Sequence, residues 1–162
     1  MARTNRELDK WFDHNVDLDN RTIYMGSSLK EDDGESGVDN LMAESFIKGI
    51  HALETRSTEQ ITILMNNPGG DWYHGMAIYD AIKMSTCPCT IKVYGYAMSM
   101  GSIILQAADH RVMMPNSKFM IHYGYSAYDN HTLIVRKWVK EEERLAAQME
   151  NIYLDMMLEK ED

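Results

Sequence analysis

The clearest structural signal in the sequence is the segment Gln60-Ile-Thr-Ile-Leu-Met-Asn-Asn-Pro-Gly-Gly70, followed by Trp72 to Met84. The β-branched run from Gln60 to Met65 predicts a strand, and the proline and two glycines that follow are typical of a turn. Helical spacing then begins at once, with apolar residues at Met76, Ala77, Ile78, Ala81 and Ile82. A strand that turns directly into a helix is the building unit of parallel α/β sheets.

The same alternation continues on both sides of this unit. An amphipathic helix is expected over 38–53 and a short strand at 21–26, both before the turn. After it, the pattern predicts a strand at 90–96, a helix at 99–108, and two strands at 111–114 and 118–122. A long helix over 133–160 closes the chain. We therefore expect one α/β domain over 1–162 with a crossover sheet, preceded by a polar segment at 1–20.

Composition limits the partners and the compartment. The 25 acidic and 16 basic residues give a net charge of -9, which repels nucleic-acid phosphates and anionic lipid surfaces. The longest nearly apolar stretch, 97–108, is too short for the ~20 residues of a bilayer span, and no secretory signal is visible at the N-terminus. We expect a cytoplasmic protein with no nucleic-acid or membrane partner. Cys87 and Cys89 are interpreted as parts of a turn, and no metal site is expected.

Three segments carry residues suited to nucleophilic catalysis. Ser99 lies where a strand gives way to a helix, so its hydroxyl can project from a sharp turn toward backbone N–H groups. His122 ends a predicted strand, and its unperturbed pKa of about 6.5 suits a general base. The glycines of Asn67-Pro-Gly-Gly70 allow close approach of a substrate. Each feature alone also has an ordinary explanation: a helix N-cap, a surface histidine and a simple turn.

Four motifs in order resemble the proteolytic subunit of the Clp protease family. They are Met65-Asn-Asn-Pro-Gly-Gly70, Gly75-Met-Ala-Ile-Tyr-Asp80, Ala97-Met-Ser-Met-Gly101 and Met114-Pro-Asn-Ser-Lys-Phe-Met-Ile-His122. The resemblance implies a crotonase-like β/α spiral with a C-terminal handle helix. It implies Ser99 as nucleophile, His122 as general base, and the N–H groups of Gly70 and Met100 as the oxyanion hole.

The resemblance also implies how such a subunit works in a larger assembly. Family members hydrolyse polypeptides inside a double ring of seven-fold symmetry. A hexameric AAA+ ATPase unfoldase feeds substrates into the chamber and is the only component that uses ATP. We accordingly expect self-association, a partner ATPase, polypeptide substrates, and no cofactor in this subunit.

Two departures from the family pattern bear on activity. The family's third triad residue is an aspartate after the handle helix, but this sequence stops at Asp162. The triad acid is therefore unknown, because Asp155 falls within the helix and Asp162 is the last residue; a truncated chain is the working hypothesis. The segment 123–131, where the family has a glycine-rich strand, contains a single glycine.

Two alternative functions follow from these observations. A structural or regulatory ring subunit with weak or no activity would explain the missing acid. A crotonase-type enzyme acting on acyl-coenzyme A would share the fold, with Asp71 as the acid close to the Pro-Gly-Gly turn, but would leave Ser99 and His122 unused.

Overall fold

The computed structural model describes residues 11, 14–26 and 37–158. These residues form two compact units, one ending at Ile121 and one starting at His122. The first unit holds a six-stranded sheet with helices packed against it, and the second holds one long helix.

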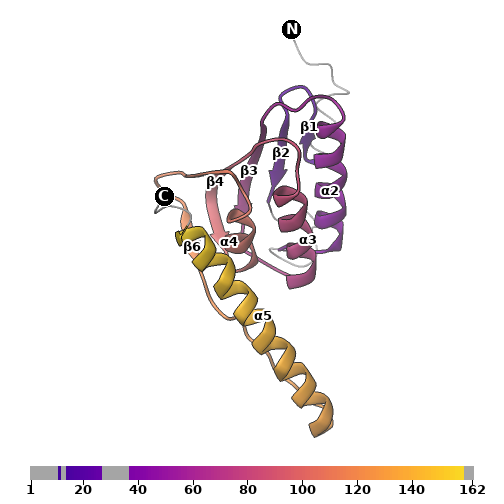
Figure 1. Cartoon of the computed structure of the whole chain (residues 1–162), viewed down its shortest axis with the longest axis vertical. Coiled ribbons are helices and arrows are strands. Elements are labelled where there is room, and N and C mark those ends of the chain that lie inside the picture. The colour runs from indigo at the N-terminus through magenta and orange to yellow at the C-terminus, as the bar shows by residue number, and fades with distance from the viewer. Residues whose placement is uncertain (1–10, 12–13, 27–36, 159–162) are drawn as a thin grey trace. The chain divides into compact units, whose positions relative to one another are not determined.

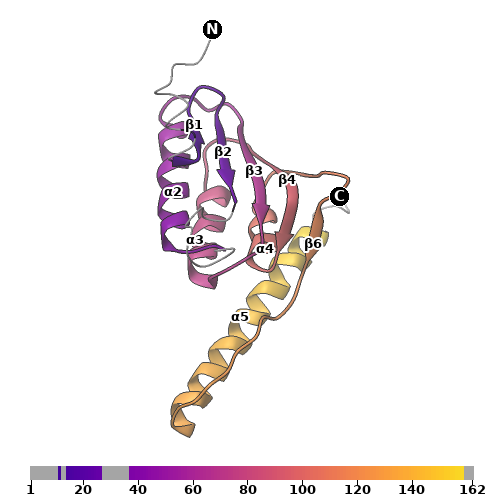
Figure 2. The same ribbon diagram turned by 180° about the vertical axis from the view of Figure 1, so that it is seen from behind.

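The sheet of the first unit is almost entirely parallel. Its strands are β1 Val16–Asp17, β2 Thr22–Met25, β3 Ile61–Asn67, β4 Cys89–Met98, β5 His110–Met113 and β6 Lys118–Met120. The order is β1-β2-β3-β4-β5, with β6 pairing farther along the edge of β4 and only β1 running antiparallel to its neighbour. Figure 2 shows β1 to β4 side by side.

Helices cover one face of this sheet, as Figure 1 shows for α2 and α3. They are α2 Asn40–Glu54, α3 Trp72–Lys83 and α4 Met100–Leu105. Alternate residues of β3, from Ile61 to Asn67, are fully buried, while those between them are partly exposed. The β-branched run recognised in the sequence therefore builds the core with every second side chain.

The predicted elements are present, with corrections at their ends. The strand predicted to reach His122 ends at Met120, and the helix predicted over 99–108 covers only 100–105. Beyond Leu105 the N–H groups of Ala107 and Ala108 bond to carbonyls three residues back, which tightens the chain into turns. β1 was not predicted, since two residues carry no measurable periodicity.

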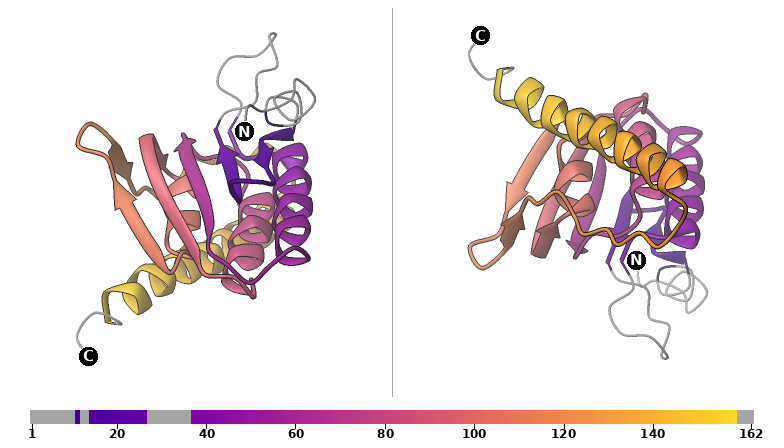
Figure 3. Two further views of the ribbon diagram at one scale, coloured as in Figure 1. Left: turned by 90° about the horizontal axis from the view of Figure 1, so that it is seen from above. Right: turned by 90° about the horizontal axis from the view of Figure 1, so that it is seen from below.

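The second unit contains α5, Thr132–Leu158, close to the predicted handle helix. The segment 122–131 runs alongside α5 without regular structure (Figures 2 and 3). The Tyr123 hydroxyl donates to Glu150 Oε1 at 2.7 Å, Ser126 Oγ donates to Glu142, and the rings of Tyr128 and Trp138 lie 5.1 Å apart. Where the family has a glycine-rich strand, this segment instead lies on its own helix.

The apolar stripe predicted for the long helix differs between its two halves. Met149, Ile152 and Met156 are buried, whereas Ile134 and Trp138 are 41% and 40% exposed. Within the described residues, no helix is both long and apolar enough to cross a bilayer.

Candidate active site

Ser99 occupies a sharp turn between β4 and α4. β4 ends at Met98 and α4 begins at Met100, so one residue changes the chain direction. Its backbone has φ 51° and ψ -124°, a conformation that non-glycine residues adopt at a cost of ~1–3 kcal/mol and that clusters at functional sites. The Ser99 side chain makes no capping hydrogen bond to α4, so the ordinary N-cap explanation does not account for it.

The turn after β3 lies directly against Ser99. Asn67 is fully buried; its Oδ1 accepts from the Gly69 N–H at 2.9 Å and its Nδ2 donates to the Gly26 carbonyl at 3.3 Å. Gly69 has φ 112°, and a Cβ there would come within 2.5 Å of Ser99 Cβ and 3.0 Å of Ser99 Oγ. Only glycine fits so close to the serine.

Residue 38 fixes the direction of the Gly70 N–H. The Val38 N–H donates to the Gly69 carbonyl at 2.6 Å, and the Asp71 N–H donates to the Val38 carbonyl at 2.9 Å. In a parallel bridge, a residue flanked by these two bonds turns its own N–H and C=O away from the partner strand. The Gly70 N–H therefore points away from Val38.

Met100 provides a second backbone donor next to Ser99. It is the first residue of α4, and the first N–H groups of a helix have no partner within the helix. The structure thus brings together three of the predicted site residues, Ser99, Gly70 and Met100, around one turn-to-turn contact. A nucleophile beside backbone N–H donors is the arrangement required for acyl transfer through a tetrahedral intermediate.

His122 is the first residue of the second unit. The chain reaches it from Met120, which pairs with Met98 and whose carbonyl accepts the Ser99 N–H at 2.9 Å. The His122 side chain is exposed, and its Nδ1 accepts a hydrogen bond from the Gly124 N–H at 3.2 Å. In the neutral ring this contact places the proton on Nε2.

The candidate acids have different placements. Asp155 lies on α5 with an exposed side chain, and Asp162 is outside the described residues. Asp71, the acid of the acyl-coenzyme A alternative, caps α3 by accepting from the His74 N–H at 2.9 Å. The structure therefore gives Asp71 a structural task, and the third triad acid stays unassigned.

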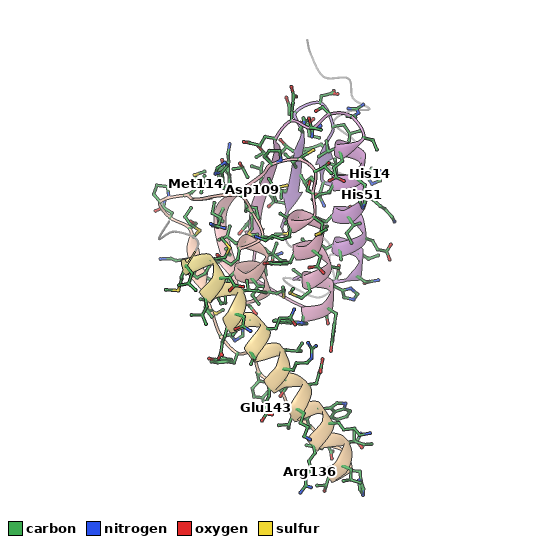
Figure 4. The ribbon with its side chains drawn as sticks, viewed as in Figure 1. His14, His51, Asp109, Met114, Arg136 and Glu143 are labelled. Atoms are coloured by element: carbon green, nitrogen blue, oxygen red, sulfur yellow. The ribbon has the colours of Figure 1, made fainter. Side chains whose placement is uncertain are left out.

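The remaining candidates have structural roles. His51 on α2, labelled in Figure 4, places Nδ1 3.0 Å from Glu54 Oε2, and Glu54 also accepts from Ser85 and Thr86. The cysteines are buried and unpaired with each other, and burial raises the pKa of Cys89 to about 11. Over the described ranges, no three metal-binding side chains come together.

Sequence reasoning missed three residues that shape this site: Val38, Asn67 and Ser102. Asn67 had a usable signal, because an asparagine just before Pro-Gly often bonds its own turn. Val38 had none, since its contact with Gly69 joins segments thirty residues apart. Ser102 lies just after the Ala97–Gly101 motif, and only the structure shows that its hydroxyl donates to the Ser99 carbonyl.

Comparisons with known proteins give a consistent result. The family model described as Clp protease matches residues 15–161. A relative named ATP-dependent Clp protease proteolytic subunit, from Deinococcus radiodurans, is 34% identical over 139 residues, which are 84% of this chain and 64% of that protein. The chloroplastic subunit 3 of Arabidopsis thaliana is 35% identical over 111 residues, or 67% of this chain and 33% of its own length.

Further matches agree on the fold. A Clp protease subunit of Leuconostoc citreum is 36% identical over 88 residues, covering 52% of this chain and 44% of the relative. A solved structure of a ClpP1 point mutant from Listeria monocytogenes superimposes with a TM-score of 0.75 at 24% identity, over 92% of this chain and 76% of that one. The expected fold is thus confirmed. The chain spans less than two thirds of the length of these curated relatives.

Proposed function

This chain belongs to the Clp protease family, and on that premise we propose that it is a serine-type peptidase subunit acting on polypeptides. The observation that carries the proposal is the Ser99 turn. A serine with φ 51° is held against Gly69, and its side chain does not cap the helix that follows. Backbone N–H groups of Gly70 and Met100 flank it. This is the set of parts that peptide-bond hydrolysis through an acyl-enzyme requires.

In the proposed reaction, Ser99 Oγ attacks the scissile carbonyl while His122 takes the hydroxyl proton. The carbonyl oxygen becomes an oxyanion that accepts hydrogen bonds from the Gly70 and Met100 N–H groups. Collapse of the intermediate breaks the C–N bond, and the histidine returns the proton to the leaving amine. Water then attacks the acyl-enzyme with His122 again as base, which releases the acid product and free Ser99.

The hydrogen bond at His122 predicts slow basal turnover. A serine base must present an unprotonated nitrogen to the hydroxyl, and triad enzymes secure this by an acid that accepts a proton from the other ring nitrogen. Here Nδ1 accepts from Gly124 N–H, which selects the opposite tautomer. Productive catalysis requires Nδ1 to exchange this donor for an acceptor.

We also propose the assembly that family membership suggests: a double heptameric ring of this subunit, fed by an AAA+ ATPase. The relatives are named ATP-dependent proteolytic subunits, which supports a partner ATPase. The Ile134 and Trp138 side chains of α5, each about two fifths exposed, offer apolar surface for self-association. Multi-angle light scattering should give a mass many times that of one chain; a stable monomer at all concentrations would refute the ring.

A second candidate is a ring subunit with little or no peptidase activity. The Nδ1 contact at His122 favours it, because it leaves the histidine in the unproductive tautomer. This candidate predicts assembly without turnover.

Hydrolysis of short fluorogenic peptides separates the two candidates. The peptidase proposal predicts measurable turnover by the wild-type chain that Ser99→Ala removes. Ser45→Ala is the matched control, because the only hydrogen bond of its α2 hydroxyl to a described residue is a 3.3 Å contact with the His14 carbonyl. Turnover that survives Ser99→Ala would refute the proposed nucleophile, and its complete absence in an assembled wild-type ring would favour the second candidate.

A further inference from the structure

We propose that Ser102 is a positioning residue that aims and strengthens the Met100 N–H of the oxyanion hole. The inference rests on the proposed function, because the oxyanion hole is part of that mechanism. Ser102 is fully buried in α4, three residues after the nucleophile. Its hydroxyl donates to the carbonyl of Ser99 itself, at 2.5 Å.

One peptide unit joins the carbonyl of Ser99 to the N–H of Met100. A trans peptide is planar, and its C=O and N–H point in opposite directions. Any contact that fixes the Ser99 carbonyl therefore also fixes the Met100 N–H on the other edge of the same plane. Two donors of Ser102 hold this carbonyl: its backbone N–H at 2.9 Å and its hydroxyl at 2.5 Å.

The hydroxyl contact also strengthens the donor electronically. Hydrogen bonds in a chain polarise one another, by about 10–30% per bond, so a carbonyl that accepts a short bond makes the N–H of the same peptide unit a better donor. The Ser99 turn lies where β4 has ended and α4 has just begun. There the Ser102 hydroxyl adds a second restraint on this peptide plane, beside the hydrogen bond from the Ser102 backbone N–H.

The other proposed donor is held in the same way. The Gly70 N–H shares a peptide plane with the Gly69 carbonyl, and that carbonyl accepts the Val38 N–H at 2.6 Å. Both donor-bearing peptide units are thus anchored through their carbonyl oxygens by bonds shorter than the usual ~2.9 Å. The Gly69 carbonyl is held by the backbone N–H of Val38, whereas the short bond to the Ser99 carbonyl comes from the Ser102 side chain, which a substitution can remove.

The chain contains a matched control for this contact. Ser117 donates to the Met114 carbonyl through its hydroxyl at 2.6 Å and its N–H at 2.9 Å, the same pair of bonds that Ser102 makes. Met114, labelled in Figure 4, is followed by Pro115, which has no N–H. Ser117→Ala therefore removes an equivalent hydrogen bond from a peptide unit that cannot act as a donor.

The test measures kcat and KM separately for peptide hydrolysis by the assembled protein. Deleting an oxyanion donor costs about 10²–10³ in kcat, so losing only its restraint should cost less. We expect Ser102→Ala to lower kcat by about 3- to 30-fold with KM within about twofold, and Ser117→Ala to change neither by more than about twofold. Ser102→Cys, similar in size but a weak donor, should resemble Ser102→Ala.

The outcomes are distinguishable from failure of the proposed function. If the wild type hydrolyses peptides and Ser102→Ala retains its kcat, the inference is wrong while the peptidase assignment stands. Full kcat in Ser102→Cys with loss in Ser102→Ala would show that Ser102 only fills space, and would equally refute the inference. If Ser102→Ala does not fold, the Ser102→Cys result decides alone. A wild type without any turnover refutes the peptidase proposal itself.

Discussion

At the scale of single residues, the site is governed by how closely two turns approach each other. Ser99 adopts a left-handed backbone, and Gly69 does the same at φ 112° directly beside it. The conformation of Ser99 is unfavourable for a non-glycine residue, whereas glycine adopts a positive φ readily. Asn67 Oδ1 accepts from the Gly69 N–H, and Val38 and Ser102 donate to the Gly69 and Ser99 carbonyls, so these bonds hold the two turns in place. The buried Asn67 and the hydrogen-bonded carbonyls of Gly69 and Ser99 thus hold the Ser99 turn in its conformation.

Gly69→Ala tests this close approach by stability. An alanine would suffer both the positive φ and a contact of 2.5 Å with Ser99 Cβ. Gly124→Ala is the matched control, since Gly124 has φ 85° but nothing within 4 Å of the added methyl. The control should lose about 1–2 kcal/mol of unfolding free energy, and Gly69→Ala at least about 1 kcal/mol more. Equal losses in urea denaturation would show that the turn is free to move away from Ser99.

At the scale of elements, the sequence predicted the helices and strands that local apolar patterns determine. It missed the features that depend on contacts between residues far apart in the chain. β3, α3 and β4 were found because their apolar periodicity and the Pro-Gly-Gly turn are local signals. The end of α4 was misplaced by three residues, because apolar residues continue past Leu105, at Ala107 and Ala108, through the turns that terminate the helix. The anchoring role of Val38 depends on a bridge to Gly70 that no local pattern encodes.

Glu54 of α2 accepts hydrogen bonds from Ser85 and Thr86 in the loop before β4, and its ionisation predicts that stability depends on pH. Burial alone would raise the pKa of Glu54, but hydrogen bonds from the Thr86 N–H, Ser85 and His51 outweigh it and hold that pKa below 4.5. The ionised carboxylate therefore ties α2 to the loop before β4. Because the folded-state pKa is depressed, this stabilisation is complete above about 4.5 and is lost as the pH falls through the folded value.

Urea unfolding of Glu54→Gln between pH 3 and 7 measures this contribution. The variant should be less stable than the wild type at neutral pH, and the difference should shrink below about pH 4.5. Glu44→Gln on the same helix is the control, since among the described residues Glu44 pairs only with the exposed Lys48, at 3.3 Å, and should give a small, nearly constant difference. A Glu54→Gln difference that does not vary with pH would contradict the role of the charge.

At the scale of the whole molecule, the family match, the fold and the Ser99 turn all agree with a Clp-type peptidase subunit as the proposed function. The sequence motifs predicted the family, the family model matches 15–161, and the fold resembles a ClpP1 structure. The Ser99–His122 pairing was suggested by the positions of the two residues and by the family resemblance, and it stays a prediction. The third triad acid stays unassigned, because no sequence pattern or contact in the described residues identifies it.

If Ser99 is an activated nucleophile, it should react with a fluorophosphonate probe. Peptide mapping by mass spectrometry should find the adduct on Ser99 in the folded wild type, with no labelling of Ser99→Ala and full labelling of Ser45→Ala. Labelling does not require rapid turnover, so the unproductive His122 tautomer slows it without preventing it. An assembled, folded protein in which Ser99 stays unmodified after prolonged exposure, or in which the adduct lies on another residue, would contradict the account.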